Sequence, residues 1–396
     1  MKRFLFTVIP EKGHVNPMIG PAMRLQERGH HVAFHAPRDI SAQLRAAGLM
    51  QLDSGAAPVP PSDLNRGAFF AEKVLDQHWL RGWIKNMLVD EVPDQIEPMR
   101  RALRDWQPDV VVTDPMLYAA AIAAALEGVP WVAVSNSLNP VLDAEVKSEL
   151  LETVRWLSPA REALFARFGI EARFRGCDLL SPWLTIAFTT EEFIGYGVPG
   201  VAMVGPSIPP GTRGDETPFS WEKLREDGRI VYMSMGSQIY YQPEFFRKMI
   251  RASADLDVQL ILSVNELLGS AVLGDLPSHV LTCHYAPQLE LLKRVRVLIT
   301  HGGANSVMEA IYFGVPLLLS PICNDQFHQA HYLRRCGAGR VLDLRTASVQ
   351  ACREVLLELL HSAEIRSAMA RLSKSYQRDG ASEAAKWIEQ MACERA

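Results

Sequence analysis

The sequence has few of the features that mark metal-binding, membrane-spanning or nucleic-acid-binding proteins. Its six cysteines lie far apart and none forms a Cys-x-x-Cys pair, so their spacing predicts neither a zinc site nor a redox-active dithiol. The formal net charge of -4 provides no basic surface for nucleic acid. The uncharged, alanine-rich run around residues 115–126 is too short to span a bilayer. We therefore expect a soluble cytoplasmic protein with buried, reduced cysteines.

The N-terminus begins with the letters MKRFLFTVIP, a basic and then apolar start that is typical of a signal peptide. The apolar run, however, covers only Phe4 to Ile9, and the polar residues Glu11 and Lys12 follow it without a small-residue cleavage site. A strand buried on both faces is the better interpretation of this run.

Apolar runs alternate with helical patterns along most of the chain. The strand at the N-terminus is followed by a loop over residues 11–16, then by a helix that Asn16 can cap with Pro17 at its first position. The same order recurs with strands at 110–113 and 131–135. This alternation predicts parallel sheets with helices on both faces.

A change in composition divides the chain. Residues 207–228 are rich in proline, glycine and charge, which is typical of a linker between domains. We therefore predict an α/β protein with two doubly wound, Rossmann-like domains that face a central cleft. Residues 1–206 form the first domain, residues 229–370 the second, and residues 371–396 are terminal helices.

A glycine-rich turn lies between a predicted strand at 297–300 and a predicted helix, in the sequence HGGANSVME of residues 301–309. A turn of this kind exposes backbone N–H groups and the positive end of the helix dipole, which bind phosphate. Two simpler interpretations stay open. The glycines can serve a tight turn alone, and Ser306 with Glu309 can form a capping box.

These residues, with YAPQ at 285–288 before them and Asp325-Gln326 after them, resemble the signature of the UDP-glycosyltransferase family. The family consists of inverting enzymes with the two-domain GT-B fold, and includes plant small-molecule enzymes and bacterial antibiotic and carotenoid glycosyltransferases. The resemblance extends from GHVNP near residue 14 to the final helices and is strongest over residues 285–330.

The resemblance implies a donor site for a nucleotide sugar. His301 and the amides of the following turn hold the pyrophosphate, Glu309 binds the ribose, and Asp325 with Gln326 binds the hexose. The donor residues that the resemblance assigns are Ser237, Tyr285, Gln288, His301, Gly303, Ala304, Asn305, Ser306, Glu309, Asp325 and Gln326. Plant members usually have tryptophan where this chain has Tyr285, so the base, uracil or thymine, stays open.

The expected chemistry needs no metal and no cofactor. Asp255 and Asp257 form a DxD, the metal motif of the other large glycosyltransferase fold, but here they join a predicted helix to the next strand. We expect the helix N-terminus and His301 to supply the positive charge instead.

His14 follows the first strand in a setting, GHVNP, that resembles the catalytic histidine loop of the family. A histidine titrates near neutral pH and can take a proton from an acceptor hydroxyl, although a capping or solvated role is the simpler alternative. Asp109 and Asp114 flank one strand, about 16 Å apart at ~3.3 Å per residue. Because parallel strands share a direction, only Asp114 can lie at the edge of the sheet where His14 lies.

Aromatic residues offer a candidate acceptor pocket in the first domain. Trp79 and Trp83 belong to a helical stripe that continues to Met87, and Phe69 and Phe70 precede it. The simpler interpretation is that this stripe packs on the domain core. The alternative is that some of these rings bind a lipophilic acceptor.

The sequence therefore predicts a glycosyltransferase that moves a hexose from a UDP- or TDP-sugar to a hydroxyl of a small lipophilic acceptor, such as a polyketide, terpenoid, carotenoid or phenol. A nucleotide-sugar epimerase and a non-catalytic sugar-nucleotide binding module are alternatives. A nicotinamide dehydrogenase is disfavoured because the loop after the first strand, EKGHVNPMIG, lacks GxGxxG. The oligomeric state stays open.

Overall fold

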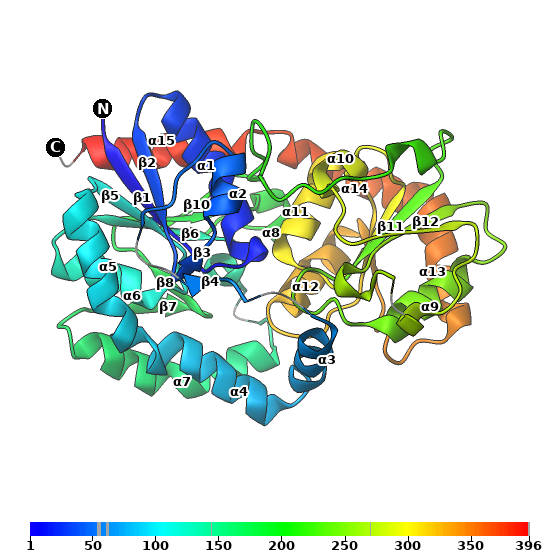
Figure 1. Cartoon of the computed structure of the whole chain (residues 1–396), viewed down its shortest axis with the longest axis horizontal. Coiled ribbons are helices and arrows are strands. Elements are labelled where there is room, and N and C mark those ends of the chain that lie inside the picture. The colour runs from blue at the N-terminus through cyan, green and yellow to red at the C-terminus, as the bar shows by residue number, and fades with distance from the viewer. Residues whose placement is uncertain (54–56, 61–62, 144, 270, 395–396) are drawn as a thin grey trace. The chain divides into compact units, whose positions relative to one another are not determined.

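The computed structural model describes residues 1–53, 57–60, 63–143, 145–269 and 271–394 (Figure 1). The chain divides into two compact units, and it passes from the first to the second and back twice. Unit 1 consists of Met1–Pro60, Gln77–Asp215 and Arg378–Ala396, and unit 2 of Pro61–Asp76 and Glu216–Gln377.

The core of unit 1 is a six-stranded parallel sheet with the order β10-β9-β6-β5-β1-β2. The predicted strands at 110–113 and 131–135 are confirmed, whereas the first strand ends at Thr7, two residues earlier than expected. The strands are β1 (Arg3–Thr7), β2 (His31–His35), β5 (Val110–Thr113), β6 (Trp131–Ser135), β9 (Leu184–Ala187) and β10 (Val201–Met203).

Each face of this sheet packs against its own set of side chains. Leu5 and Val111 lie on one face, in an apolar cluster with residues of the helices α5 (Val92–Trp106), α6 (Tyr118–Leu126) and α7 (Glu149–Ala166). Phe6 and Phe34 stack on each other with ring centroids 5.1 Å apart, and the strand alternation places them on the opposite face. The strands are therefore buried on both faces, as their continuous apolar sequences predict.

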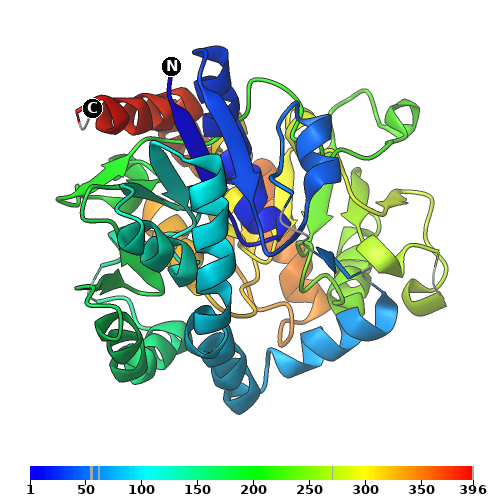
Figure 2. The ribbon, with the colours of Figure 1, turned by 60° about the vertical axis from the view of Figure 1, so that its left-hand side comes forward.

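The helices of unit 1 connect and cover these strands, and Figure 2 shows the C-terminal helix beside the first helix of the chain, with which it is in contact. The elements that the sequence analysis missed include the strands β9 and β10, the small parallel pair of β3 and β4, and an antiparallel hairpin of β7 and β8. The remaining elements are α1 (Lys12–Glu27), β3 (Arg38–Asp39), α2 (Ser41–Ala46), β4 (Ala57–Pro58), α4 (Gln77–Lys85), the π-helix η1 (Asn86–Asp90), α5 (Val92–Trp106), α6 (Tyr118–Leu126), η2 (Asn139–Val141), α7 (Glu149–Ala166), β7 (Arg173–Arg175), β8 (Asp178–Leu180), α8 (Glu191–Ile194) and α15 (Gly380–Cys393).

The helix α1 begins at Lys12, four residues before the predicted cap at Asn16. The side chain of Asn16 is buried and cannot cap, because its amide nitrogen donates to Asp215 at 3.0 Å and its amide oxygen accepts from Gln43 at 2.8 Å. Pro17 consequently lies inside the helix. His14 therefore belongs to the first turn of α1 and not to a loop, which is a correction to the sequence-based prediction.

Unit 2 also contains a six-stranded parallel sheet, with the order β13-β12-β11-β14-β15-β16. The predicted strand at 297–300 is confirmed, and the chain after Leu344 is helical as expected. The elements are α3 (Leu64–Lys73), η3 (Trp221–Lys223), β11 (Ile230–Ser234), α9 (Pro243–Ser253), β12 (Gln259–Ser263), η4 (Asn265–Leu267), η5 (Ala271–Leu273), β13 (Val280–Cys283), α10 (Gln288–Leu292), β14 (Val297–Thr300), α11 (Ala304–Phe313), β15 (Leu317–Leu319), α12 (Gln326–Cys336), β16 (Gly339–Val341), α13 (Val349–His361) and α14 (Ala363–Tyr376).

The helix α3 belongs to unit 2 although the chain before and after it belongs to unit 1. The ring of Tyr240 lies directly against Gly67, where an added Cβ would stand only 2.4 Å from the tyrosine oxygen. That oxygen donates to the carbonyl of Asp63 at 2.9 Å. Glycine at position 67 therefore allows α3 to lie this close to Tyr240 in the rest of unit 2.

Each sheet has a point at which the strand order reverses. In unit 1 the chain runs from β1 to β2 and then returns to β5 on the other side of β1, and in unit 2 the reversal lies between β11 and β14. Open parallel sheets bind ligands at the carboxyl ends of the strands at this reversal. Ligand-binding residues are therefore expected directly after β1 and β5 in unit 1 and directly after β11 and β14 in unit 2.

A buried histidine makes the stability of unit 1 sensitive to acid. His35, at the end of β2, is 6% exposed, and burial lowers its pKa from 6.5 to about 4. Between these two pKa values the unfolded chain binds a proton that the folded chain does not. The contribution of His35 to the free energy of unfolding is therefore fully present above pH 6.5 and is lost as the pH falls towards 4.

We expect His35 to account for a loss of roughly 3 kcal/mol when this titration is complete. Chemical denaturation at several pH values between 7.5 and 4 measures it, with His35→Gln as the comparison. The variant should show a shallower loss of stability with acid. An identical pH dependence in both proteins would contradict the assignment.

Candidate active site

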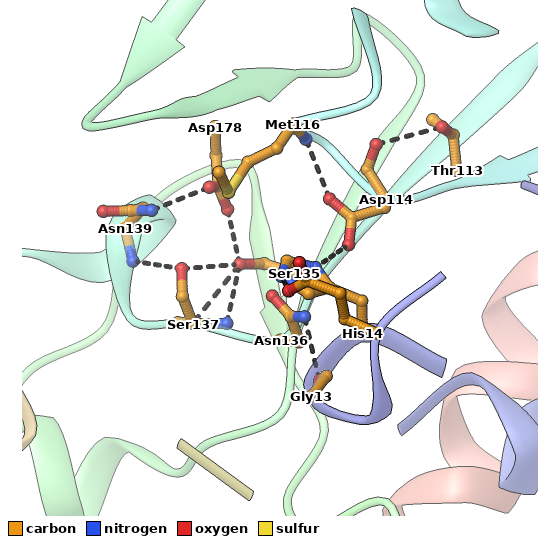
Figure 3. Close-up of polar contacts among 11 residues, drawn as sticks. Gly13, His14, Thr113, Asp114, Met116, Ser135, Asn136, Ser137, Asn139 and Asp178 are labelled. Atoms are coloured by element: carbon orange, nitrogen blue, oxygen red, sulfur yellow. Dashed lines mark hydrogen bonds and ion pairs between the residues drawn. The ribbon is translucent and has the colours of Figure 1, made fainter. Parts of the chain in front are cut away.

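His14 and Asp114 lie at the reversal point of unit 1 and contact each other directly (Figure 3). His14 is in the first turn of α1, which follows β1, and Asp114 directly follows β5. Their side chains approach to 2.5 Å between Nδ1 of His14 and Oδ2 of Asp114. Residues 100 positions apart in the sequence are thus brought together by the pairing of two neighbouring strands.

Both oxygens of the Asp114 carboxylate have hydrogen-bond partners. Its side chain is fully buried, and its second oxygen accepts the backbone N–H of Met116 at 2.9 Å. Because an ionised carboxylate only accepts hydrogen bonds, Nδ1 of His14 carries the proton in this pair. The neutral ring then has its lone pair on Nε2, so the ring can accept a proton there and Asp114 stabilises the resulting imidazolium.

Asp109 lies at the opposite edge of the sheet, as the geometric argument predicts. Its carboxylate accepts the backbone N–H of Arg3 at 2.7 Å and pairs with the Lys2 ammonium at 3.3 Å. The choice of Asp114 over Asp109 as the partner of His14 is therefore confirmed.

In unit 2, two glycine loops enclose the ring of His301 at the corresponding reversal point. Gly236 follows β11 and Gly303 precedes α11. A Cβ would stand 2.6 Å from the His301 ring at Gly236, and 2.7 Å from it at Gly303. Only glycine fits at both positions, so the loop that contains Ser237 and the loop that contains His301 lie against each other.

His301 differs from the sequence-based expectation in its charge. Burial lowers its pKa from 6.5 to about 4, against the opposing effect of the backbone of Ser234, so the ring is neutral near pH 7. A neutral imidazole can donate one hydrogen bond to a phosphate oxygen, but it brings no positive charge. Any charge compensation in this loop must come from the N-terminus of α11.

The helix α11 begins at Ala304 with Gly303 as its N-cap, and residues 303–306 are all partly exposed. The capping-box interpretation of Ser306 and Glu309 is wrong, because Ser306 lies inside the first turn. Instead, the amide nitrogen of Gln288 donates to Glu309 at 2.7 Å and to the Ser306 hydroxyl at 3.3 Å. Glu309 is only 2% exposed, so Gln288 holds its carboxylate in place.

The other donor candidates lie in loops of the same unit. The amide oxygen of Gln326 accepts the backbone N–H groups of Ile322 and Cys323, at 2.8 and 3.2 Å, so this side chain shapes the loop before α12. Asp325 is the N-cap residue of α12 and its side chain does not cap that helix. Tyr285 is half-buried, and its carbonyl accepts the hydroxyl of Thr217.

The four candidate acceptor aromatics do not belong to one unit. Phe69 and Phe70 are on α3 of unit 2, where Phe69 is 52% exposed. Trp79 and Trp83 are on α4 of unit 1, stacked with ring centroids 6.3 Å apart and packed against the apolar core. The two tryptophans are therefore partly buried against the core, as the simpler interpretation predicts.

No metal site is formed among the residues that the structure describes, in that no group of three or more His, Cys, Asp and Glu side chains is placed to hold an ion. The DxD residues lie in the turn between α9 and β12, where Asp257 pairs with Arg225 at 2.8 Å and with Arg229. Within the described part of the chain, no helix is both long and apolar enough to cross a membrane.

The sequence analysis missed Asn136, which follows β6. Its amide nitrogen donates to the carbonyl oxygen of Gly13 at 3.0 Å, directly beside His14 (Figure 3). The available signal was Pro17, which has no N–H to donate to the carbonyl of Gly13, four residues before it. The sequence does not indicate which distant side chain fills that position.

Two family models together match most of the chain. Residues 218–391 match the model described as UDP-glucoronosyl and UDP-glucosyl transferase, and residues 23–163 match that of the N-terminal domain of erythromycin biosynthesis protein CIII-like proteins. Together with the two doubly wound sheets, these matches define a GT-B glycosyltransferase.

Similar proteins and solved structures extend over the full chain. The chain is 25% identical to the uncharacterized UDP-glucosyltransferase YojK of Bacillus subtilis, over 97% of this chain and 96% of that protein. It is 26% identical to the oleandomycin glycosyltransferase of Streptomyces antibioticus, over 94% and 86% of the two chains. The calicheamicin glycosyltransferase CalG4 superposes with a TM-score of 0.74 at 24% identity, over 100% of this chain and 99% of that one. Over residues 218–391 the chain matches the model of the UDP-glycosyltransferase family, and it is a glycosyltransferase with the GT-B fold.

Proposed function

We propose that this glycosyltransferase transfers a hexose, with inversion at the anomeric carbon, from a UDP- or TDP-sugar to a hydroxyl of a small lipophilic natural product. The observation that carries the proposal is the 2.5 Å contact between His14 and the fully buried Asp114 at the end of β1 and β5. A module that only bound sugar nucleotides would have no use for a histidine activated in this way.

In the proposed reaction, Nε2 of His14 removes the proton from the acceptor hydroxyl. The acceptor oxygen forms a bond to the anomeric carbon, and the bond between that carbon and the diphosphate oxygen breaks. Asp114 holds the ring in the required tautomer and stabilises its protonated form. One displacement gives a product with the opposite anomeric configuration, and the nucleoside diphosphate leaves without a metal ion.

Unit 2 is proposed to bind the donor. The first turn of α11 and the neutral ring of His301 contact the pyrophosphate, together with Ser237. Glu309, held by Gln288, binds the ribose hydroxyls, and Tyr285 stacks on the base. Asp325 and Gln326 contact the hexose.

The choice of donor and acceptor draws on similar proteins. Two solved neighbours contain thymidine diphosphate: the glycosyltransferase VinC, with a TM-score of 0.69, and the spinosyn rhamnosyltransferase SpnG, with a TM-score of 0.73. Among the similar sequences are the oleandomycin glycosyltransferase and the 4'-demethylrebeccamycin synthase. These names favour a polyketide or another lipophilic natural product as the acceptor.

The proposal is tested in two stages. Calorimetry with UDP-glucose, TDP-glucose, UDP, TDP and NAD should show binding in one diphosphate series and none with NAD. That donor is then incubated with a panel of macrolide, terpenoid, carotenoid and phenolic acceptors. The expected product is a β-glycoside from an α-configured donor, read from its proton NMR coupling. Retention of configuration, or conversion of the donor at the same rate without acceptor, would contradict the proposal.

A further inference from the structure

Two prolines inside α1 cannot donate the backbone hydrogen bonds that other residues at these positions would donate. Pro17 and Pro21 both lie in the interior of the helix. A proline has no N–H, so the carbonyl four residues before it cannot form the usual helical hydrogen bond. The carbonyls in question are that of Gly13, four residues before Pro17, and that of Pro17, four residues before Pro21.

Each of these two carbonyls accepts a hydrogen bond from a side chain of another segment of unit 1. Asn136, after β6, donates its amide N–H to the oxygen of Gly13 at 3.0 Å. Ser207, after β10, donates its hydroxyl to the oxygen of Pro17 at 2.6 Å. Side-chain hydrogen bonds thus hold α1 at two successive turns. Only the first of them, from Asn136, lies next to His14.

The carbonyl of Gly13 belongs to the peptide group that also contains the N–H of His14. That N–H donates to the carbonyl of Glu11 at 2.8 Å, so the peptide is held from both of its polar ends. The orientation of this peptide sets the direction in which the His14 side chain leaves the backbone. Asn136 therefore forms a hydrogen bond with the backbone from which the His14 ring extends, and Asp114 forms a hydrogen bond with the ring itself (Figure 3).

The turn that carries Asn136 is itself fixed by a buried carboxylate. The hydroxyl of Ser135 donates to Asp178 at 2.5 Å, and the amide nitrogen of Asn139 donates to the other oxygen of Asp178 at 2.8 Å. All three of these side chains are buried. Gly176 leaves the space for Asn139, because a Cβ on it would stand 2.4 Å from the asparagine oxygen. Residues on both sides of Asn136 are thus held in place.

We propose that Asn136 is a positioning residue for the general base, and that its hydrogen bond to the Gly13 carbonyl sets the aim of His14 toward the acceptor hydroxyl. The inference rests on the proposed role of His14. It assigns to Asn136 no contact with either substrate. Loss of the bond should affect the rate of the proton-transfer step and leave the binding of donor and acceptor unchanged.

The test compares Asn136→Ala and the isosteric Asn136→Asp, both of which remove the N–H donor, with Asn136→Gln, which keeps an amide. Misplacement of a reacting group by about 1 Å costs on the order of 100-fold in rate, so we expect kcat to fall roughly 10- to 100-fold in the Ala and Asp variants. The KM for the acceptor and the Kd for the donor should stay at their wild-type values. Asn136→Gln should recover part of the lost rate.

Ser207→Ala is the matched control, because it removes a side-chain hydrogen bond to the carbonyl of Pro17, one turn further along the same helix. We expect a loss of stability with an unchanged kcat. If Ser207→Ala lowers kcat as much as Asn136→Ala does, the effect belongs to the whole helix and the proposal is overturned. Wild-type kcat in both Asn136→Ala and Asn136→Asp would overturn it as well.

A spectroscopic measurement separates this inference from the proposed function. The short bond from Nδ1 of His14 to Asp114 should give a far-downfield imidazole N–H proton in the NMR spectrum, assigned by its loss in His14→Ala. That signal should shift or broaden in Asn136→Ala and stay in place in Ser207→Ala. An unmoved signal in Asn136→Ala overturns the positioning role. Full activity of His14→Ala would instead contradict the proposed function.

Discussion

Replacement of His14 by alanine is expected to lower kcat for sugar transfer by about 10²- to 10⁴-fold, the usual contribution of a general base. The reason is that the acceptor hydroxyl loses the group that takes its proton, while the donor site in unit 2 is untouched. Initial-rate kinetics with saturating donor and acceptor measure the effect. Calorimetry should give an unchanged Kd for the donor.

Asp114→Asn tests the contribution of the carboxylate in the pair of His14 and Asp114. An asparagine keeps the shape of the side chain but can present its amide N–H to Nδ1 of His14, which favours the wrong tautomer. We expect a loss of kcat of similar order to that of His14→Ala, and the double variant should be no worse than the poorer single one.

A second histidine–carboxylate pair provides the control for both variants. His30 and Glu389 of unit 1 approach to 2.9 Å between Nε2 and Oε1. Because neither residue is part of the proposed site, His30→Ala should keep the wild-type kcat. Full transfer activity in His14→Ala, or an equal loss in His30→Ala, would refute the role given to His14.

Glu309→Ala should weaken donor binding by about 10- to 100-fold, because a hydrogen bond to a charged group contributes roughly 1.5–3 kcal/mol. The carboxylate of Glu309 is buried and held by Gln288, so its geometry is fixed before the donor arrives. Calorimetric titration with the preferred nucleotide sugar measures the change. Glu309→Gln, which keeps the shape and one acceptor oxygen, should lose less affinity than Glu309→Ala.

The matched control is Glu290→Ala. Glu290 lies in the first turn of α10 and pairs with Lys293 at the surface, where both side chains are more than half exposed. Its removal should change neither the Kd for the donor nor the stability by more than a few tenths of a kcal/mol. Donor affinity that stays at the wild-type level in Glu309→Ala would refute the ribose-binding role.

Parts of this structure that depend on local sequence were predictable. The strands at 110–113, 131–135 and 297–300 are continuous apolar runs between turn residues, and their bounds agree with the structure. The choice of Asp114 over Asp109 also followed from the sequence, because it needed only the shared direction of parallel strands and the length of one strand.

The parts that the sequence did not reveal depend on distant neighbours. Asn16 has a favourable cap sequence around it, yet Asp215, 199 positions away, takes its side chain and the helix starts earlier. His301 is a neutral ring because of burial that no local pattern describes. The side chain of Asn136 reaches the carbonyl of Gly13 only because β6 and β1 end at the same edge of one sheet.

The path of the chain between its two units has a consequence for recombining this enzyme with its relatives. The boundaries fall after Pro60, Asp76, Asp215 and Gln377. A hybrid made with one crossover in the 207–228 segment would keep its own α3 but receive a foreign residue in place of Tyr240, against which Gly67 is fitted. In such a hybrid, α1 would come from one parent and α15, which packs against it, from the other. Hybrids that move residues 63–76 together with the second unit, and leave α15 with the first, should inherit donor preference without losing their fold.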